Sequence, residues 1–168
     1  EEGIGLKVYV LAPPRAEKRL FKDLPTGKGE SYEVYLTSVD EAAAVAGRQF
    51  SAAAIAAALG IDPEESEARC SQLARRSLLV AAAGEHTWPD GTETAVFRFD
   101  HDLYQEVVYQ RVPPQRRARL HLQIGRRLED GYGTAAPEHA TELAMHFIRG
   151  RDATRAATLT LFSQTVRT

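Results

Sequence analysis

The stretch that decides the fold reads Leu78-Leu79-Val80-Ala81-Ala82, then a polar turn with Trp88-Pro89-Asp90-Gly91, then Thr94-Ala95-Val96-Phe97-Arg98-Phe99. Both flanking runs are rich in apolar and β-branched residues, which is typical of short strands. An Asp-Gly pair between two such runs favours a tight turn. The sequence therefore predicts a β-hairpin over residues 78–99.

Three short helices are predicted before this hairpin, over residues 39–47, over residues 52–59 and from Asp62 onward. Ser51 is a suitable N-cap for the second helix, and Gly47 and Gly60 are suited to ending the first two. Asp62 followed by a proline is a favoured helix start. The inward stripe of the third helix is expected to comprise Ala68, Cys70, Leu73, Ala74 and Ser77. Three helices followed by a hairpin predict a winged helix-turn-helix domain over residues 39–99.

The remainder of the chain is predicted to be helical. Residues 100–131 form two linking helices, broken at Pro113-Pro114, and the second carries Leu120, Ile124 and Leu128 at a spacing of four. Residues 132–168 contain a further pair of antiparallel helices, over 138–149 and 152–166, which is typical of the start of a tetratricopeptide-like repeat region. The expected fold class is mainly α, with one short hairpin.

Residues 1–38 differ in character and are left unassigned. They contain two strand-like runs, over 6–11 and 32–36, without enough apolar surface for a domain. Glu1 is not a start methionine, and the last predicted helix ends without a capping signal. We therefore expect a fragment of a larger protein.

Composition narrows the class of protein. The 168 residues carry a formal net charge of −2, which disfavours a general nucleic-acid binder. No apolar run approaches the roughly 20 residues that a membrane span needs. The single Cys70 excludes a disulfide within the chain and is expected to be a small core residue. These features favour a cytoplasmic protein without membrane contact.

Motifs for catalysis or metal binding are missing from the sequence. A phosphate-binding P-loop reads G-x-x-x-x-G-K-[ST], but Gly27-Lys28 is followed by Gly29 and lacks the first glycine of the motif. His139 and His146 share a helix face without an H-E-x-x-H pattern or a cysteine partner for zinc. We expect no catalytic residues, no metal site and no enzymatic activity of this chain on its own.

Four blocks of sequence resemble the region that follows the ATPase core in STAND-type predicted ATPases. They are AAAVAGRQFS at 42–51, LARRSLL at 73–79, FRFDHDLYQEVVY at 97–109 and PPQRRARLH at 113–121. Such ATPases occur in large bacterial LuxR-type regulators and beside adenylate or guanylate cyclase domains. The resemblance covers roughly residues 40–168, and residues 1–38 are not matched.

The resemblance implies a role in regulation. In such proteins the winged helix closes over a nucleotide held by the ATPase core, and the repeats that follow sense ligands or partners. Implied partners are therefore the ATPase core and helical repeats of the same polypeptide, and other proteins. ATP or ADP is the implied cofactor of the whole protein, with none in this chain.

One residue is implied to sense the nucleotide. Related NB-ARC proteins have a Met-His-Asp motif whose histidine lies near the bound diphosphate. The similar string here is Asp100-His101-Asp102, with Asp100 in place of methionine. A histidine at a helix N-terminus suits this role, because the free N–H groups and the helix dipole favour an anion there. The alternatives are that His101 caps the helix or pairs with a neighbouring aspartate.

A DNA-binding winged-helix regulator is the alternative function. In that geometry the third helix enters the major groove with its N-terminal residues nearest the phosphates. Here those residues include Glu64, Glu65 and Glu67, and the hairpin carries Glu85, Asp90 and Glu93. Carboxylates facing a polyanion are repelled, so the sequence disfavours DNA as a partner.

An interaction surface is predicted at the densest basic cluster. It contains Arg116, Arg117 and Arg119, opposite the leucine stripe of the same helix. A solvated face and an acidic protein partner are the two leading interpretations, with nucleic acid third. Trp88 at the hairpin tip either packs back on the hairpin or contacts a neighbouring domain.

Overall fold

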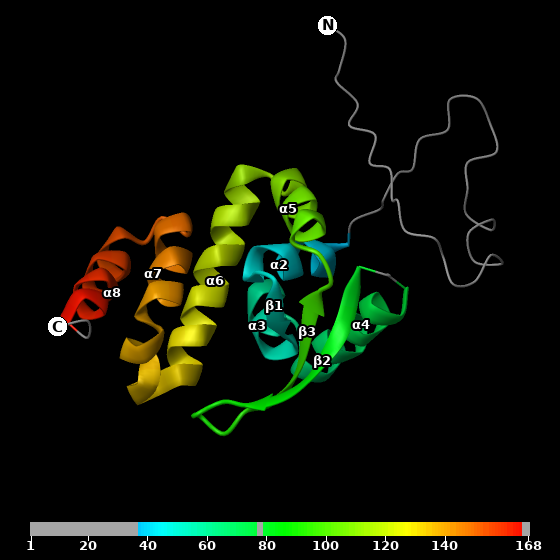
Figure 1. The fold of residues 1–168 in the computed structure, drawn as a ribbon, viewed down its shortest axis with the longest axis horizontal. Coiled ribbons are helices and arrows are strands. Elements are labelled where there is room, and N and C mark those ends of the chain that lie inside the picture. The colour runs from blue at the N-terminus through cyan, green and yellow to red at the C-terminus, as the bar shows by residue number, and fades with distance from the viewer. Residues whose placement is uncertain (1–36, 77–78, 166–168) are drawn as a thin grey trace, which may run out of the picture. The chain divides into compact units, whose positions relative to one another are not determined.

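The computed structural model describes residues 37–76 and 79–165 (Figure 1). These residues form a mainly helical fold with one three-stranded antiparallel sheet, which confirms the mainly α prediction and its short hairpin. The two strand-like runs predicted within residues 1–38, and Ser77 of the predicted stripe, lie outside the described residues. Among the described helices, none combines the length and apolar character needed to cross a membrane.

The first helices begin and end at residues suited to a helix terminus. They are α2 (Ser38–Ala46), α3 (Ala52–Leu59) and α4 (Pro63–Arg76). Ser51 Oγ accepts a hydrogen bond from the Ala54 N–H at 3.2 Å, and Asp62 Oδ1 accepts one from the Glu64 N–H at 2.8 Å. Gly60 ends α3 with a φ of 65°, which glycine adopts readily because it has no Cβ. The predicted caps at Ser51, Gly60 and Asp62 are confirmed.

The sheet contains β1 (Gln49–Ser51), β2 (Val80–Thr87) and β3 (Glu93–Phe99), in the order β1-β3-β2. Strands β2 and β3 form the predicted hairpin, with a bulge between Ala82 and Gly84. Strand β1 is absent from the prediction because three residues between two helices are too short to show a period-two pattern. It pairs with β3 by placing Phe50 opposite Phe97, and the two buried rings lie 5.8 Å apart.

The remaining helices are α5 (Asp102–Arg111), α6 (Pro114–Tyr132), the 3-10 helix η1 (Gly133–His139), α7 (Ala140–Arg149) and α8 (Ala153–Thr165). Figure 1 shows α7 and α8 on one side of α6, with α2, α3 and the sheet on the other. Leu120, Ile124 and Leu128 are buried on α6, as their spacing predicts. The pair α7–α8 lies where two helices are predicted, although η1 replaces the start of the first.

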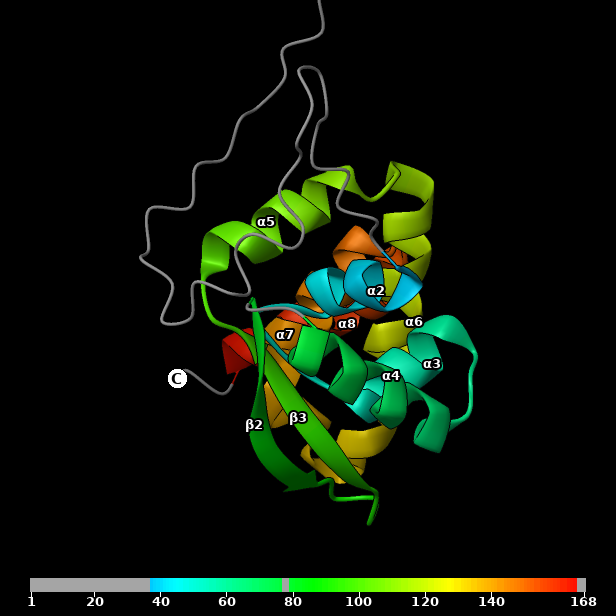
Figure 2. The same cartoon turned by 90° about the vertical axis from the view of Figure 1, so that its right-hand side faces the viewer.

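Helix α2 is covered on all sides. Its Ala42, Ala43 and Ala44 are each 0% exposed, and three consecutive helical residues point in directions about 100° apart. Helices α3, α4, α5 and α6 all contact α2, and Figure 2 shows α5 on one side of it with α3 and α4 on the other. Alanine side chains permit this, because their small size lets neighbouring helices approach closely.

The inward stripe of α4 differs from the prediction. Cys70 and Leu73 are buried as predicted, but Ala68 is exposed and Ser66 is fully buried instead. Ser66 Oγ donates a hydrogen bond to the Ala52 carbonyl of α3 at 2.7 Å, which satisfies the hydroxyl inside the core. The prediction for Ala68 was wrong because residue polarity alone does not reveal a hydrogen-bond partner on another helix.

The tip of the β2–β3 hairpin is held against α6 by Trp88. The side chain is 4% exposed and lies so close to Gly131 that a Cβ there would come within 1.7 Å of Trp88 Cε3. The guanidinium of Arg127 lies 4.5 Å from the Trp88 ring centroid and donates to Asp90 Oδ2 at 2.8 Å. Hydrogen bonds from the Thr92 backbone and from Arg127 lower the pKa of Asp90 to about 2. The hairpin tip is therefore fixed by packing and by charge.

Replacing Gly131 with alanine should destabilise the fold, although alanine is the better helix former. The new Cβ would overlap the Trp88 ring, and overpacking of this kind costs about 1–3 kcal/mol of unfolding free energy. Urea unfolding of the 168-residue chain measures the loss. The emission of Trp88, the single tryptophan, should move to longer wavelength as the ring meets water.

Asp130→Ala is the matched control, because Asp130 is the exposed neighbour of Gly131 on the same helix. Equal stability of the two variants would contradict the packing of Trp88 on Gly131.

Candidate functional site

His101 lies on the surface between β3 and α5, where the backbone turns into the helix. Its φ of −136° and ψ of 134° are extended, and its side chain makes no capping hydrogen bond to α5. The imidazole lies beside the Tyr104 ring, with the two centroids 5.8 Å apart. The structure thus places His101 at the N-cap position of α5 as an exposed residue whose imidazole does not cap the helix.

Two arginines that sequence reasoning did not single out form ion pairs with the aspartates on either side of His101. Arg98 precedes it on β3, and Arg48 is brought alongside because β1 pairs with β3. Arg48 Nε lies 3.1 Å from Asp102 Oδ1, and Arg98 Nε lies 3.9 Å from Asp100 Oδ1. The signal for Arg48 was weak, because its position depends on the short strand that the sequence pattern does not reveal.

This exposed surface has the chemistry for contact with an anion. Guanidinium groups pair with phosphate oxygens, and the first turn of α5 presents free backbone N–H groups in the same place. The carboxylates of Asp100 and Asp102 pair with the arginines, but exposed ion pairs contribute only about 1 kcal/mol or less. The ion pairs of Arg48 and Arg98 are therefore weak enough for an anion to displace.

The predicted arginine surface is partly engaged within the chain. Arg116 Nε donates to Glu41 Oε2 at 2.5 Å, which joins α6 to α2. The guanidinium of Arg117 lies 4.6 Å from the centroid of the Tyr109 ring. Arg119 is exposed. Two of the three arginines therefore contribute to contacts between helices, whereas Arg119 is exposed.

Trp88, which the sequence placed in the same interaction surface, lies in the interior. It packs on α6, with its ring 5.5 Å from the Tyr132 ring at an interplanar angle of 17°. Its side chain therefore presents almost no surface to a neighbouring domain. The turn sequence gave no sign of this position, because the ring contacts a helix that is distant along the chain.

A pair of buried histidines was missed by sequence reasoning. His121 on α6 and His146 on α7 are both 0% exposed, and their Nδ1 atoms lie 3.1 Å apart. The Tyr109 hydroxyl of α5 lies 3.0 Å from His121 Nε2, whereas His146 Nε2 has no hydrogen-bond partner among the described residues. A row of polar contacts thus joins three helices. In the sequence, each histidine lies next to a large apolar residue, Leu120 or Phe147, and both of these residues are buried in the structure.

Both histidines are neutral near pH 7. Burial, together with electrostatic repulsion from His146 and Arg149, lowers the pKa of His121 to about 3. Burial and Arg149 lower the pKa of His146 to about 4. Between two neutral imidazoles one Nδ1 donates and the other accepts, and the Tyr109 hydroxyl can act in either sense. The row therefore has two possible hydrogen-bond directions.

Other groups with catalytic potential are unreactive or isolated. Burial raises the pKa of Cys70 to about 11, which keeps its thiol protonated and a poor nucleophile. Within residues 37–76 and 79–165, no group of three or more His, Cys, Asp or Glu side chains could hold a metal ion.

Comparison with known proteins leaves the interpretation to the residues themselves. No family model, curated protein or solved structure matches the chain. The function must therefore be argued from the four sequence blocks and from the geometry around His101.

The stability of the chain should fall as the pH is lowered from about 6.5 to about 4. Both histidines have an ordinary pKa of 6.5 when unfolded but about 3 and about 4 when folded, so in this window the unfolded state binds more protons. Acid therefore favours unfolding, by up to about 1.4 kcal/mol per pH unit for each histidine. Urea unfolding at a series of pH values measures the slope.

Substitution of one histidine tests the assignment. His146→Leu should remove about half of the histidine contribution to this slope, whereas His86→Gln, at an exposed position on β2, should leave the slope unchanged. If His146→Leu keeps the full slope, the buried pair is not its source.

Proposed function

We propose that this chain is a regulatory segment of a STAND-type ATPase, coupling the nucleotide state of an ATPase core to helical sensor repeats. In this proposal residues 39–99 are a winged helix, α5 and α6 link it onward, and η1, α7 and α8 begin a tetratricopeptide-like region. The order of one helix, a strand, two helices and a hairpin supports the winged-helix assignment, as does the strand order β1-β3-β2.

The observation that carries the proposal is the exposed position of His101 between Asp100 and Asp102, each of which forms an ion pair with an arginine. A diphosphate held by a separate core would meet an imidazole, the guanidinium groups of Arg48 and Arg98, and the N-terminus of α5. The nucleotide in this proposal is ATP or ADP bound by the core, and this chain contributes contacts to it from one side.

An exposed apolar side chain beside His101 supports a domain contact at this place. Leu103 is 63% exposed on α5. A single exposed leucine is ordinary in itself. Because Leu103 lies in the first turn of α5, we propose that the domain that presents the nucleotide contacts this end of the helix.

Polar contacts connect α5 to the helices beyond it. Gln105 Nε2 donates to the Ala44 carbonyl of α2 at 2.5 Å. Tyr109 contacts His121 of α6, which contacts His146 of α7. A displacement of α5 on nucleotide contact would therefore be transmitted through His121 of α6 to α7. We propose this row as the connection between the nucleotide and the repeats.

The charge of α4 weighs against the alternative of a DNA-binding winged helix. Exposed Glu64, Glu65 and Glu67 occupy the end of the helix that would face the phosphates, and exposed Glu85 and Glu93 lie on the hairpin.

Removing the His101 imidazole should speed the release of ADP from a protein that contains this chain together with its ATPase core. The loss of one hydrogen bond to a charged group corresponds to about a tenfold faster release. Stopped-flow displacement of a fluorescent ADP analogue measures the rate for His101→Ala. Glu106→Ala, at an exposed position on the same helix, is the control. An unchanged rate in His101→Ala would remove His101 from the mechanism.

The 168-residue chain should not bind duplex DNA in a gel-shift assay at low salt. Glu64→Lys combined with Glu65→Lys should create weak binding that decreases steeply with salt, because the repulsion at the start of α4 is replaced by attraction. Salt-sensitive binding by the unmodified chain would support the DNA-binding alternative and contradict the present proposal.

A further inference from the structure

Two guanidinium groups from different helices gather at one aromatic ring. The guanidinium carbon of Arg117 in α6 lies 4.6 Å from the centroid of the Tyr109 ring, and that of Arg149 in α7 lies 5.7 Å from the same centroid. Arg149 is exposed, and Arg117 and Tyr109 are half-buried, so a ligand in solution can reach this place. We call Arg117 and Arg149 the arginine pair.

Close packing of α7 on α6 brings the second arginine to this ring. Gly150 ends α7, and a Cβ there would lie only 2.9 Å from the Leu122 backbone nitrogen of α6. The absence of a side chain therefore lets the end of α7 touch α6. Arg149 directly precedes this contact in the sequence, which fixes its backbone beside α6.

The arginine pair has no anionic partner within residues 37–76 and 79–165. Arg117 Nη1 donates long hydrogen bonds of 3.4 Å to the Tyr109 carbonyl and to Gln110 Oε1, and both acceptors are neutral. The Arg149 guanidinium contacts the ring and forms no hydrogen bond or ion pair with a described residue. Most of the N–H donors of the two guanidinium groups are therefore free to bind a ligand.

Carboxylates on the neighbouring helices are engaged elsewhere. Glu41 of α2 pairs with Arg116, and Glu106 of α5 accepts a hydrogen bond from Gln110 Nε2. The positive charge of the arginine pair is therefore not neutralised by these side chains.

The start of α6 adds positive charge to the same region. Its N-cap is Pro113, which provides no side-chain cap, and its first turn contains no acidic residue. Arg117 lies in this turn, although the helix dipole disfavours a cation at a helix N-terminus. The same dipole favours a bound anion. An anion at the arginine pair would therefore relieve repulsion that the chain leaves uncompensated.

The charge of the arginine pair also acts on the buried histidines. Burial is the main cause of the low pKa of His121 and of His146, but Arg149 lowers both values and Arg117 lowers that of His121. Tyr109 is the titratable group that reaches His121 from α5. An anion that neutralises the arginine pair would therefore raise the pKa of both histidines.

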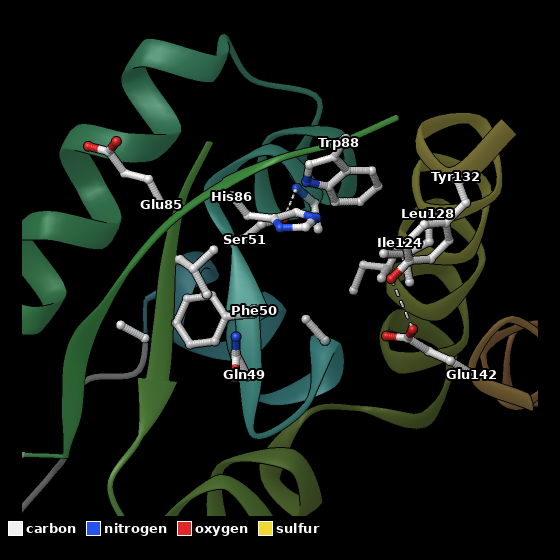
Figure 3. A pocket seen from close by; sticks show the side chains of 14 residues that line it. Gln49, Phe50, Ser51, Glu85, His86, Trp88, Ile124, Leu128, Tyr132 and Glu142 are labelled. Carbon is white, nitrogen blue, oxygen red and sulfur yellow. Dashed lines mark hydrogen bonds between the residues drawn. The ribbon is translucent and has the colours of Figure 1, made fainter. Parts of the chain in front are cut away.

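The cavity between the β2–β3 hairpin and α6 offers no comparable place for an anion. Among the described residues that line it, the charged ones are Glu85 and Glu142. Figure 3 shows Glu142 turned toward Tyr132, whose hydroxyl donates to it at 3.2 Å, and Glu85 pointing away from the rings. An anion there would meet negative charge only.

We propose that the arginine pair binds a phosphate-type oxyanion, which joins α6 to α7 beside Tyr109. A carboxylate offers two oxygens, which match one guanidinium fork, whereas a phosphate group has enough oxygens to accept from both forks. A double negative charge also matches the two guanidinium charges. The site does not depend on the nucleotide role proposed for His101, which lies at the other end of α5.

Nuclear magnetic resonance titration of the 168-residue chain tests the site. Inorganic phosphate and sulfate, at an ionic strength held constant with sodium chloride, should shift the amide signals of Gln110, Arg117 and Arg149 in a saturable way. Acetate should bind more weakly. Phosphoserine compared with inorganic phosphate distinguishes a phosphorylated protein from a free anion as the source. No saturable shift at these amides, or equal binding of acetate, would overturn the proposal.

Variants of the arginine pair provide an independent test. Arg117→Gln and Arg149→Gln should each weaken sulfate binding about tenfold, the effect of losing a hydrogen bond between charged groups. Arg149→Lys keeps the charge without the planar fork and should have a smaller effect. Arg126→Gln, at an exposed position on α6, should bind sulfate as the unmodified chain does. Unchanged affinity in both glutamine variants would overturn the assignment.

The pH dependence of binding tests the position of the anion beside the histidines. Because the bound anion raises the pKa of His121 and His146, linkage requires sulfate to bind more tightly as the pH is lowered toward about 4. His146→Leu should bind sulfate normally at neutral pH and show a smaller increase in acid. An increase as large as that of the unmodified chain would overturn this position for the anion.

Discussion

The enclosure of α2 is the constraint on which the other elements depend. Its alanines let α3, α4, α5 and α6 approach one helix closely, and Ala42, Ala43 and Ala44 are each 0% exposed. The position of α5, and with it His101, follows from this packing. The Gln105 contact to the Ala44 carbonyl adds a polar connection at the same interface.

Helix α6 connects these helices to the C-terminal ones, and its glycines determine how closely neighbouring elements approach it. A Cβ at Gly125 would lie 3.1 Å from the His146 Cβ, so the absence of a side chain there lets α7 come near. The close approach places His146 beside His121 in an environment that holds both rings neutral. The expected loss of stability in acid is thus a consequence of the close helix packing at Gly125.

Features set by neighbouring residues were predictable, and features set by contacts between distant elements were not. The caps at Ser51 and Asp62 and the hairpin turn follow from local backbone chemistry, so a single sequence reveals them. Strand β1, the burial of Ser66 and the histidine pair each need a partner from another element. At the candidate site, His101 was predicted from a motif and from its position in the sequence. Arg48 is placed near it only because β1 pairs with β3. The burial of Trp88 was not predicted for the same reason, because its ring packs on Gly131 of α6, a residue that is distant along the chain.

The β2–β3 hairpin is attached at both of its ends, with β3 paired to β1 near the base and Trp88 packed on Gly131 at the tip. These two attachments restrict the motion of the hairpin relative to β1 and to α6. A rotation of α6 about its own axis would therefore be conveyed through the hairpin to β1. Because Arg48 directly precedes β1 and pairs with Asp102, the base of the hairpin is also joined to the start of α5, beside His101.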